Sequence, residues 1–188
     1  MVWLDLGGNQ IDDAGAQALA RTLERNAVLA TLNLGGNNIG VVGAEALART
    51  LERNAALNRL DLHFNRIGTA GAQALAHALE RNTALNWLDL AGNYIDDAGA
   101  EALAHMLERN TTLTWLDLGG NNIRAETLQT IDRYLERNRR LAEERAIQVA
   151  VPLQQVAIAA AQVRNNTNTG NSNSSSCSAC YCGPNTEK

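Results

Sequence analysis

The sequence predicts an α/β solenoid, or horseshoe, of about five 28-residue units, with a concave parallel sheet and convex helices. One observation is that leucine, asparagine and isoleucine each recur at intervals of 28 residues. A second is that each unit changes period, from two in its first half to the spacing of a helix in its second. Units of this length cannot bury an apolar face alone, so we expect them to stack. The aligned leucines and asparagines are Leu4, Leu32, Leu60, Leu88 and Leu116, then Asn9, Asn37, Asn65, Asn93 and Asn121.

The first half of a unit, seen in residues 85–95, has the pattern of a short strand. Leu88 and Leu90 alternate with Trp87 and Asp89, so the leucines face the core and the other two face outward. Asn93 follows the strand, and its side-chain amide can satisfy backbone groups in a buried turn.

The second half of that unit, residues 96–110, has the pattern of an amphipathic helix. Asp96 or Asp97 can cap its start, and Asn110 stands where a left-handed residue often ends a helix. Small residues such as Gly99 are expected to let the helix lie close to the strand layer. The apolar stripe consists of Ala100, Leu103, Ala104 and Leu107.

Leu85 to Ile95 fits the motif L-x-x-L-x-L-x-x-N-x-L, and the helix that follows repeats as GAxALAxxLERN. With its 28-residue period, this pattern resembles the leucine-rich repeats of the ribonuclease-inhibitor type. It is most similar to the repeats of NOD-like receptors (the NLRC subgroup). The resemblance covers residues 1 to about 141 and implies the fold, whereas function depends on the residues that the scaffold carries.

The two ends of the array are expected to differ. The first unit begins inside its strand and has no polar cap, so its first layer should be exposed. A fragment, a start assigned too late, and a chain that relies on a partner or on self-association through this unit all remain open. The last unit carries extra polar residues such as Arg133, Arg137 and Arg140, as a C-terminal cap requires.

We predict three segments: a repeat solenoid over 1–141, a C-terminal helical extension over 142–163, and a disordered Asn/Ser-rich tail over 164–188. The extension contains several glutamines and Pro152, which favours a broken amphipathic helix on the last repeat over a membrane span. The tail holds the three cysteines, Cys177, Cys180 and Cys182, with no histidine among them. An inert reduced tail is favoured over palmitoylation or a metal site shared with another chain.

The composition of the chain limits the kinds of partner and the cellular location that we expect. A net charge of −4 gives no support for nucleic-acid binding, which favours a basic face. The repeats contain no cysteine and the N-terminus shows no secretory signal, so we expect a cytoplasmic protein.

The residues between the strand leucines are expected to line the concave face. One column holds all three tryptophans and the next is mostly aspartate. Tryptophan and arginine are enriched at binding hot spots, and stacked aspartates repel one another unless a basic partner relieves them. The third unit is the odd one, so we place the centre of specificity there. The alternative is that these are consensus residues copied by duplication. The candidate partner-binding residues are Trp3, Asp5, Arg59, Asp61, His63, Phe64, Trp87, Asp89, Trp115 and Asp117.

No catalytic, cofactor-binding or metal site is predicted, because the repeats show no nucleophile elbow and no phosphate-cradling loop. We therefore predict a non-enzymatic module that binds a protein partner. By resemblance it would be a sensing or regulatory repeat protein of the NOD-like-receptor type, or a bacterial effector that imitates one. The alternatives are a GTPase activator of the Ran type, none of whose functional residues we can match, and an inhibitor like ribonuclease inhibitor.

Overall fold

The computed structural model describes residues 2–169, and for part of the last helix it describes the backbone alone. Strands and helices alternate along the chain, and the strands form one parallel sheet in the order β1-β2-β3-β4-β5. The strands are β1 (Val2–Asp5), β2 (Leu29–Asn33), β3 (Arg59–Asp61), β4 (Trp87–Asp89) and β5 (Trp115–Asp117). The helices are α1 (Asp13–Leu23), α2 (Val41–Leu51), α3 (Gly68–Leu79), α4 (Asp97–Arg109) and α5 (Ala125–Thr169).

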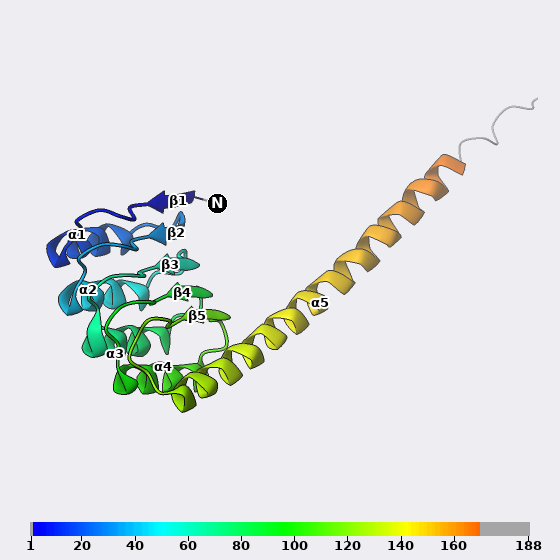
Figure 1. The fold of residues 1–188 in the computed structure, drawn as a ribbon. Helices are drawn as coiled ribbons and strands as arrows, with labels where there is room; N and C mark the ends of the chain where they lie inside the picture. Colours follow the sequence, from blue (N-terminus) through cyan, green and yellow to red (C-terminus); the bar gives the residue numbers. More distant parts are fainter. Residues whose placement is uncertain (1, 170–188) are drawn as a thin grey trace, which may run out of the picture. The chain divides into compact units, whose positions relative to one another are not determined.

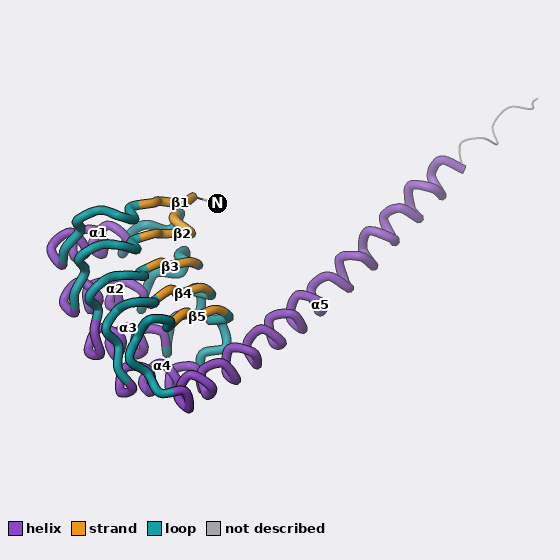
Figure 2. The backbone as a smooth tube through the Cα atoms, viewed as in Figure 1, coloured by secondary structure: helices purple, strands orange, loops and turns teal. Residues whose placement is uncertain are grey.

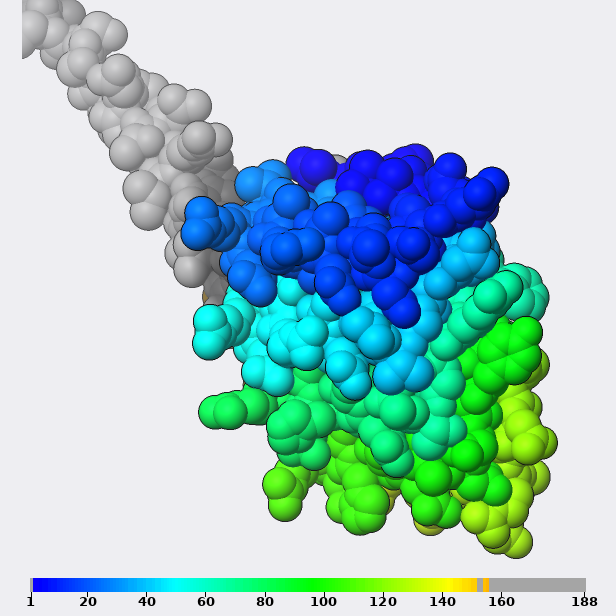
Figure 3. Space-filling view, turned by 90° about the vertical axis from the view of Figure 1, so that its left-hand side faces the viewer, coloured from blue at the N-terminus to red at the C-terminus, as the bar shows by residue number. Residues whose placement is uncertain are grey.

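The repeats form two layers, with the strands on one side and α1 to α4 on the other (Figures 1 and 2). The helices fan out more widely than the strands, so the sheet lines the inner side of the curve (Figure 1). Seen from the helix side, the repeats follow one another as coloured layers (Figure 3). The predicted α/β solenoid is therefore confirmed.

The core lies between the two layers and is built from the predicted columns of leucine and isoleucine. Leu60 pairs in register with Leu32 on one side and Leu88 on the other. Leu88, Leu90 and the aligned Ile95 are completely buried. Burying such a side chain stabilises the fold by roughly 1.5–3 kcal/mol. In the central repeats, neighbours on both sides contribute to this burial.

Two asparagine columns join each repeat to the one before it. The Asn93 amide donates to the carbonyl of Leu62 at 2.8 Å, and its oxygen accepts from the Ile67 amide at 3.3 Å. The second column, which includes Asn82, lies in the turn that follows each helix. Asn82 donates to the carbonyls of Leu51 and Asn54 at 2.7 and 3.1 Å. Both columns satisfy backbone groups that would otherwise be buried without partners.

The prediction of a left-handed Asn110 was wrong. Asn110 is extended, with φ −73° and ψ 118°. Its side chain donates to the carbonyls of Leu79 and Asn82 and accepts from the amides of Thr112 and Leu113. These bonds between repeats fix its conformation, so the helix needs no left-handed residue to end it.

The helical glycines allow close packing against a core isoleucine and against the neighbouring helix, and the expectation that small residues let a helix lie close to the strand layer stays a prediction. A Cβ atom on Gly71 would lie 2.5 Å from Ile67 Cγ2 and 3.0 Å from Ala44 Cβ on the preceding helix. The predicted cap of α4 is confirmed for Asp96, whose carboxylate accepts from the Gly99 amide at 3.2 Å. Hydrogen bonds from the Thr69 hydroxyl and then from that amide lower the pKa of Asp96.

The two ends of the array differ in how far their residues are exposed. In the first repeat, Trp3 is 64% exposed and Leu4 is 38% exposed. In the last repeat, α5 covers the core with Ile131 and Leu135, and Asn138 donates to the carbonyls of Asn110 and Leu113.

The chain divides into two compact units, Met1–Glu144 and Arg145–Lys188. Helix α5 spans Ala125–Thr169 without the break expected at Pro152, and it extends past the predicted start of the tail at residue 164. The predicted segments 1–141, 142–163 and 164–188 stay a prediction. The cysteine segment lies outside the described residues. None of the described helices has an apolar stretch long enough to cross a bilayer.

Candidate functional site

The inner face of the sheet carries the predicted column of tryptophans. Parallel pairing places Trp3 beside Thr31, Thr31 beside Arg59, Arg59 beside Trp87, and Trp87 beside Trp115. Adjacent parallel strands lie about 4.8 Å apart, so each side chain meets the next one along the column.

Three members of this column form a continuous stack. The rings of Trp87 and Trp115 lie 4.2 Å apart with an interplanar angle of 1°. The guanidinium carbon of Arg59 lies 4.4 Å from the centre of the Trp87 ring, within the range of a cation–π contact. Trp87 is half-buried between these two neighbours, while Trp115 remains 37% exposed. We call Arg59, Trp87 and Trp115 the ring stack.

The aspartate column beside the ring stack has a structural role that the sequence did not reveal. In each repeat the carboxylate or amide oxygen accepts from the backbone N–H two residues later, which closes the turn after the strand. Asp89 accepts from Ala91 at 2.9 Å, and Asn33 accepts from Gly35 at the same distance. This bond supports the alternative that the column is in part a consensus feature of the fold.

Asp89 is nevertheless in an unfavourable electrostatic position. Burial raises its pKa, and the neighbouring carboxylates of Asp61 and Asp117 raise it further. The Ala91 amide and His63 act in the opposite direction and do not cancel the increase. Burial and these two carboxylates thus make the ionised form of Asp89 less favourable than that of an exposed aspartate.

The third repeat differs from the others where β3 ends. His63 Nδ1 lies 2.6 Å from Asp61 Oδ1, and the ring fills the space where a Cβ on Gly35 would be. Phe64 has φ +48°, and its ring occupies the space where a Cβ on Gly92 would be. The aligned residues of the other repeats are glycines with φ between 64° and 68°. Non-glycine residues rarely adopt this backbone, so a phenylalanine that is 67% exposed here is strained.

Five segments of the chain match the sequence profile described as "Leucine Rich repeat", namely residues 4–20, 25–48, 53–76, 81–104 and 109–131. The chain belongs to the leucine-rich repeat family. No curated protein matches its sequence.

Two solved structures share the fold. One is "Leiomodin-1 Actin-Binding Site 2 (ABS2)", with a TM-score of 0.72 and 23% identity over 83% of this chain and 89% of that one. The other is the tropomodulin C-terminal domain of Caenorhabditis elegans, with a TM-score of 0.70 and 12% identity over 78% of this chain and 89% of that one. At these identities the similarity establishes the leucine-rich repeat fold.

The leucine-rich repeats bring only some of the predicted site residues together. Arg59 contacts Trp87, and Trp87 contacts Trp115. Trp3 lies beside Thr31, outside the ring stack. The Asn33 side-chain amide donates to the Asp5 carboxylate at 2.8 Å. Asp89 receives its hydrogen bond from the Ala91 backbone amide and has an aspartate on each neighbouring strand.

Tyr94 is an exposed residue that the sequence reasoning missed. It is 76% exposed and has φ +58° in the turn after β4. The aligned positions hold Gln10, Asn38, Arg66 and Asn122, so a single aromatic residue in a polar column was the available signal.

One group of side chains could supply ligands to a metal ion. Ligand atoms of Asp61, His63 and Asp89 lie within 4.8 Å of one another, which suits the nitrogen and oxygen preferences of zinc. His63 is already paired with Asp61 through Nδ1. No second observation points to an ion at these three residues, so we propose no metal site and treat them as part of the inner face.

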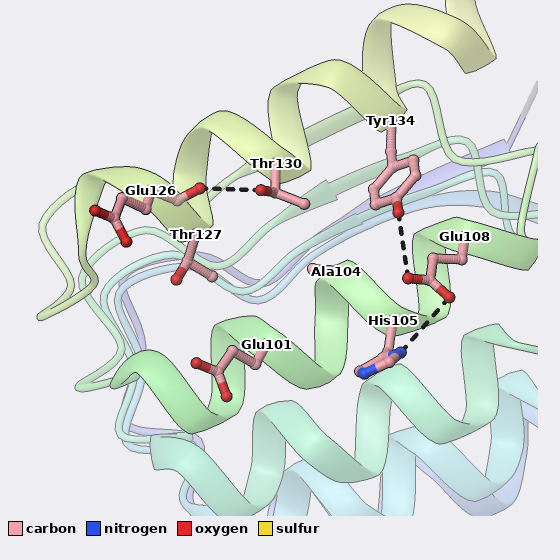
Figure 4. Close-up of a pocket in the computed structure, with 8 residues that line it drawn as sticks. All are labelled: Glu101, Ala104, His105, Glu108, Glu126, Thr127, Thr130 and Tyr134. Atoms are coloured by element: carbon pink, nitrogen blue, oxygen red, sulfur yellow. Dashed lines mark hydrogen bonds and ion pairs between the residues drawn. The ribbon is translucent and has the colours of Figure 1, made fainter.

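A separate hollow of about 320 Å³ lies between α4 and the first turns of α5 (Figure 4). Glu101, His105 and Glu108 line it from α4, and Glu126 and Tyr134 line it from α5. The Tyr134 hydroxyl donates to Glu108 at 3.2 Å, and His105 Nδ1 lies 3.6 Å from the same carboxylate. These contacts are those of a helix–helix seam, and we assign no function to the hollow.

Proposed function

We propose that this leucine-rich repeat protein is an interaction module that binds a protein partner through the inner face of its sheet and performs no chemistry. The ring stack of Arg59, Trp87 and Trp115 carries the proposal. The leucine and asparagine columns hold the fold together from the other side of the sheet, so the stack is free to serve a partner.

The stack has the physical properties of a binding hot spot. Tryptophan offers a large contact area with two side-chain torsions, so little entropy is lost when a partner packs against it. Here the parallel rings and the guanidinium restrict one another before any partner arrives, which lowers that cost further. Phe64 and His63 extend the same face beyond the end of β3.

The test compares proteins captured by the wild-type chain with those captured by the double variant Trp87→Ala and Trp115→Ala. Quantitative mass spectrometry should show a set of partners lost at least about tenfold from the double variant, as expected when two hot-spot residues are removed. Trp3→Ala is the matched control, because it removes an exposed tryptophan outside the stack. Identical partners for wild type and double variant, with both chains folded by circular dichroism, would refute the proposal.

The same proposal includes narrower assignments of role, location and partner. The repeat motif supports a sensing or regulatory role of the NOD-like-receptor type or a bacterial effector, and the distribution of cysteines supports a cytoplasmic location. The exposed first repeat supports self-association through β1. The first partner to test is actin, because the similar leiomodin-1 structure is that of an actin-binding site. Co-sedimentation with actin, GTP-hydrolysis assays and ribonuclease inhibition each separate one alternative from the others.

A further inference from the structure

The contact between Arg59 and Trp87 is an internal example of how this face holds a cation. The guanidinium of Arg59 lies over a tryptophan ring, and Asp61 follows two residues later on the same strand and the same face. The fourth and fifth repeats present the same combination of tryptophan and aspartate, as Trp87 with Asp89 and Trp115 with Asp117. Neither of these repeats carries an arginine in that column.

The basic side chain near Asp89 is His63, which lies within 4.8 Å of it and is already paired with Asp61. Among the described residues, Asp89 and Asp117 take part in no ion pair with an arginine or lysine. Each receives a turn amide on one oxygen, from Ala91 at 2.9 Å and from Gly119 at 2.8 Å. No donor in the part of the chain that the structure describes forms a hydrogen bond to the second oxygen of either carboxylate, so this oxygen can accept from a partner.

The turn next to Asp117 leaves room for a ligand. A Cβ on Gly119 would have one near neighbour, Asp117 Oδ1 at 3.1 Å. A Cβ on Gly120 would meet the backbone of Gly92 at 3.6 Å and no side chain. His63 fills the space beside Gly35, in the turn after β2, and Phe64 fills the space beside Gly92, in the turn after β4. The open part of the face therefore lies at the turn after β5.

We infer that the partner presents an arginine in an extended basic segment, and that this arginine binds where Trp115, Asp117 and Asp89 meet. Its guanidinium packs against the exposed part of Trp115 and donates to the free oxygens of Asp89 and Asp117. Arginine suits the site better than lysine because its planar group can stack on a ring and bond to carboxylates at once. The negative charge of neighbouring carboxylates, which disfavours the ionised form of Asp89, would attract the guanidinium of the partner. This inference rests on the proposed function and specifies the partner's chemistry.

The experiment titrates the full chain with three synthetic peptides, in which glycine alternates with arginine, lysine or glutamine. The indole N–H signals of the three tryptophans report the site by NMR. The arginine peptide should shift Trp115 and Trp87 but not Trp3, and should bind at least about threefold more tightly than the lysine peptide. The glutamine peptide should cause no shift.

The double variant Asp89→Asn and Asp117→Asn should lower the affinity for the arginine peptide about tenfold at low salt, because two charge-assisted contacts are lost. The folded state should tolerate asparagine here, since Asn33 already accepts the same turn bond in the second repeat. Glu52→Gln with Glu80→Gln is the matched control, which removes two charges from the exposed ends of helices and should leave the affinity unchanged.

Equal binding of the arginine and lysine peptides, or an unchanged affinity in the double asparagine variant, would overturn the inference. A shift centred on Trp3 would also overturn it. Failure here is distinguishable from failure of the proposed function. If captured partners still depended on Trp87 and Trp115, the protein would remain an interaction module, and only the inference that its partner presents an arginine would be wrong.

Discussion

The two sides of the sheet contrast in what fixes their residues. On the core side, Asn54, Asn82 and Asn110 use their amide nitrogen and oxygen to bond backbone groups of two repeats. On the inner side, Arg59 contacts Trp87 and Trp87 contacts Trp115 within one column, and the residue type of this column varies from repeat to repeat. The fold therefore dictates the core columns and leaves the inner column open to selection for binding.

The aspartate column stands between these two cases. One side-chain oxygen of each residue closes a turn, as in the core asparagines, while Asp89 and Asp117 form no ion pair with an arginine or lysine of the described residues. Repetition alone therefore does not tell whether a column serves the fold or a partner. The contrast can be tested by substitution on each side.

The largest effect is expected for Asn82→Ala on the core side. The change leaves the carbonyls of Leu51 and Asn54 and the amides of Ala84 and Leu85 without their partner in a buried turn. We expect the free energy of unfolding in urea to fall by about 3 kcal/mol, since each unpaired buried group costs about 1 kcal/mol or more. The exposed Asn86→Ala should change it by less than about 0.5 kcal/mol. Equal effects of the two variants would contradict the contrast.

A gain in stability of about 1 kcal/mol is expected for Phe64→Gly, because glycine adopts φ +48° without steric cost. Thermal unfolding measures the change. Phe64→Ala separates the backbone from the ring, because alanine keeps the strained conformation and removes the ring. If Phe64→Ala stabilised the chain as much as Phe64→Gly, the ring would be the source of the strain instead of the backbone.

The smallest effect is expected for Asp89→Asn, and it should depend on pH. Because the pKa of Asp89 is raised in the folded state, its ionisation disfavours folding at neutral pH. Removing the charge should therefore stabilise the chain at pH 7 by about 0.5 kcal/mol or less, since the group is partly exposed and screened. The gain should disappear as the pH falls below the ordinary aspartate value of 3.8, where both states are protonated.

Urea unfolding at several pH values measures this difference, and Asp132→Asn on α5 is the control that removes one charge away from the sheet. A gain that persists at pH 3 would mean that the carboxylate charge is not its cause.

Most of the fold could be predicted from the sequence because its period fixes both the strand register and the helix face. Leu88, Asn93 and Leu103 each have a single physically acceptable environment, and their recurrence at one interval places them all. Asn110 was misplaced because its conformation depends on carbonyls of the preceding repeat, which a reading of one helix end does not include.

The candidate site could be predicted only in part. The columns were visible in the sequence, since alternation in a strand assigns Trp87 and Asp89 to one face. The stacking of Arg59 on Trp87, and the raised pKa of Asp89, depend on side-chain packing and burial that aligned residue types alone do not contain. The turn bonds of the aspartates are local, and the sequence could have predicted them, because aspartate often accepts from the amide two residues later.

The bonds that link each asparagine to the preceding repeat bear on how such a chain can change during evolution. Duplication or loss of one whole 28-residue copy leaves every core asparagine opposite a suitable carbonyl, whereas an insertion of another length does not. A new copy between the third and fourth would separate Arg59 from Trp87 while preserving the core. Gene slippage can thus lengthen the inner surface strand by strand and reorder its side chains, which gives a lineage new binding surfaces at little risk to folding.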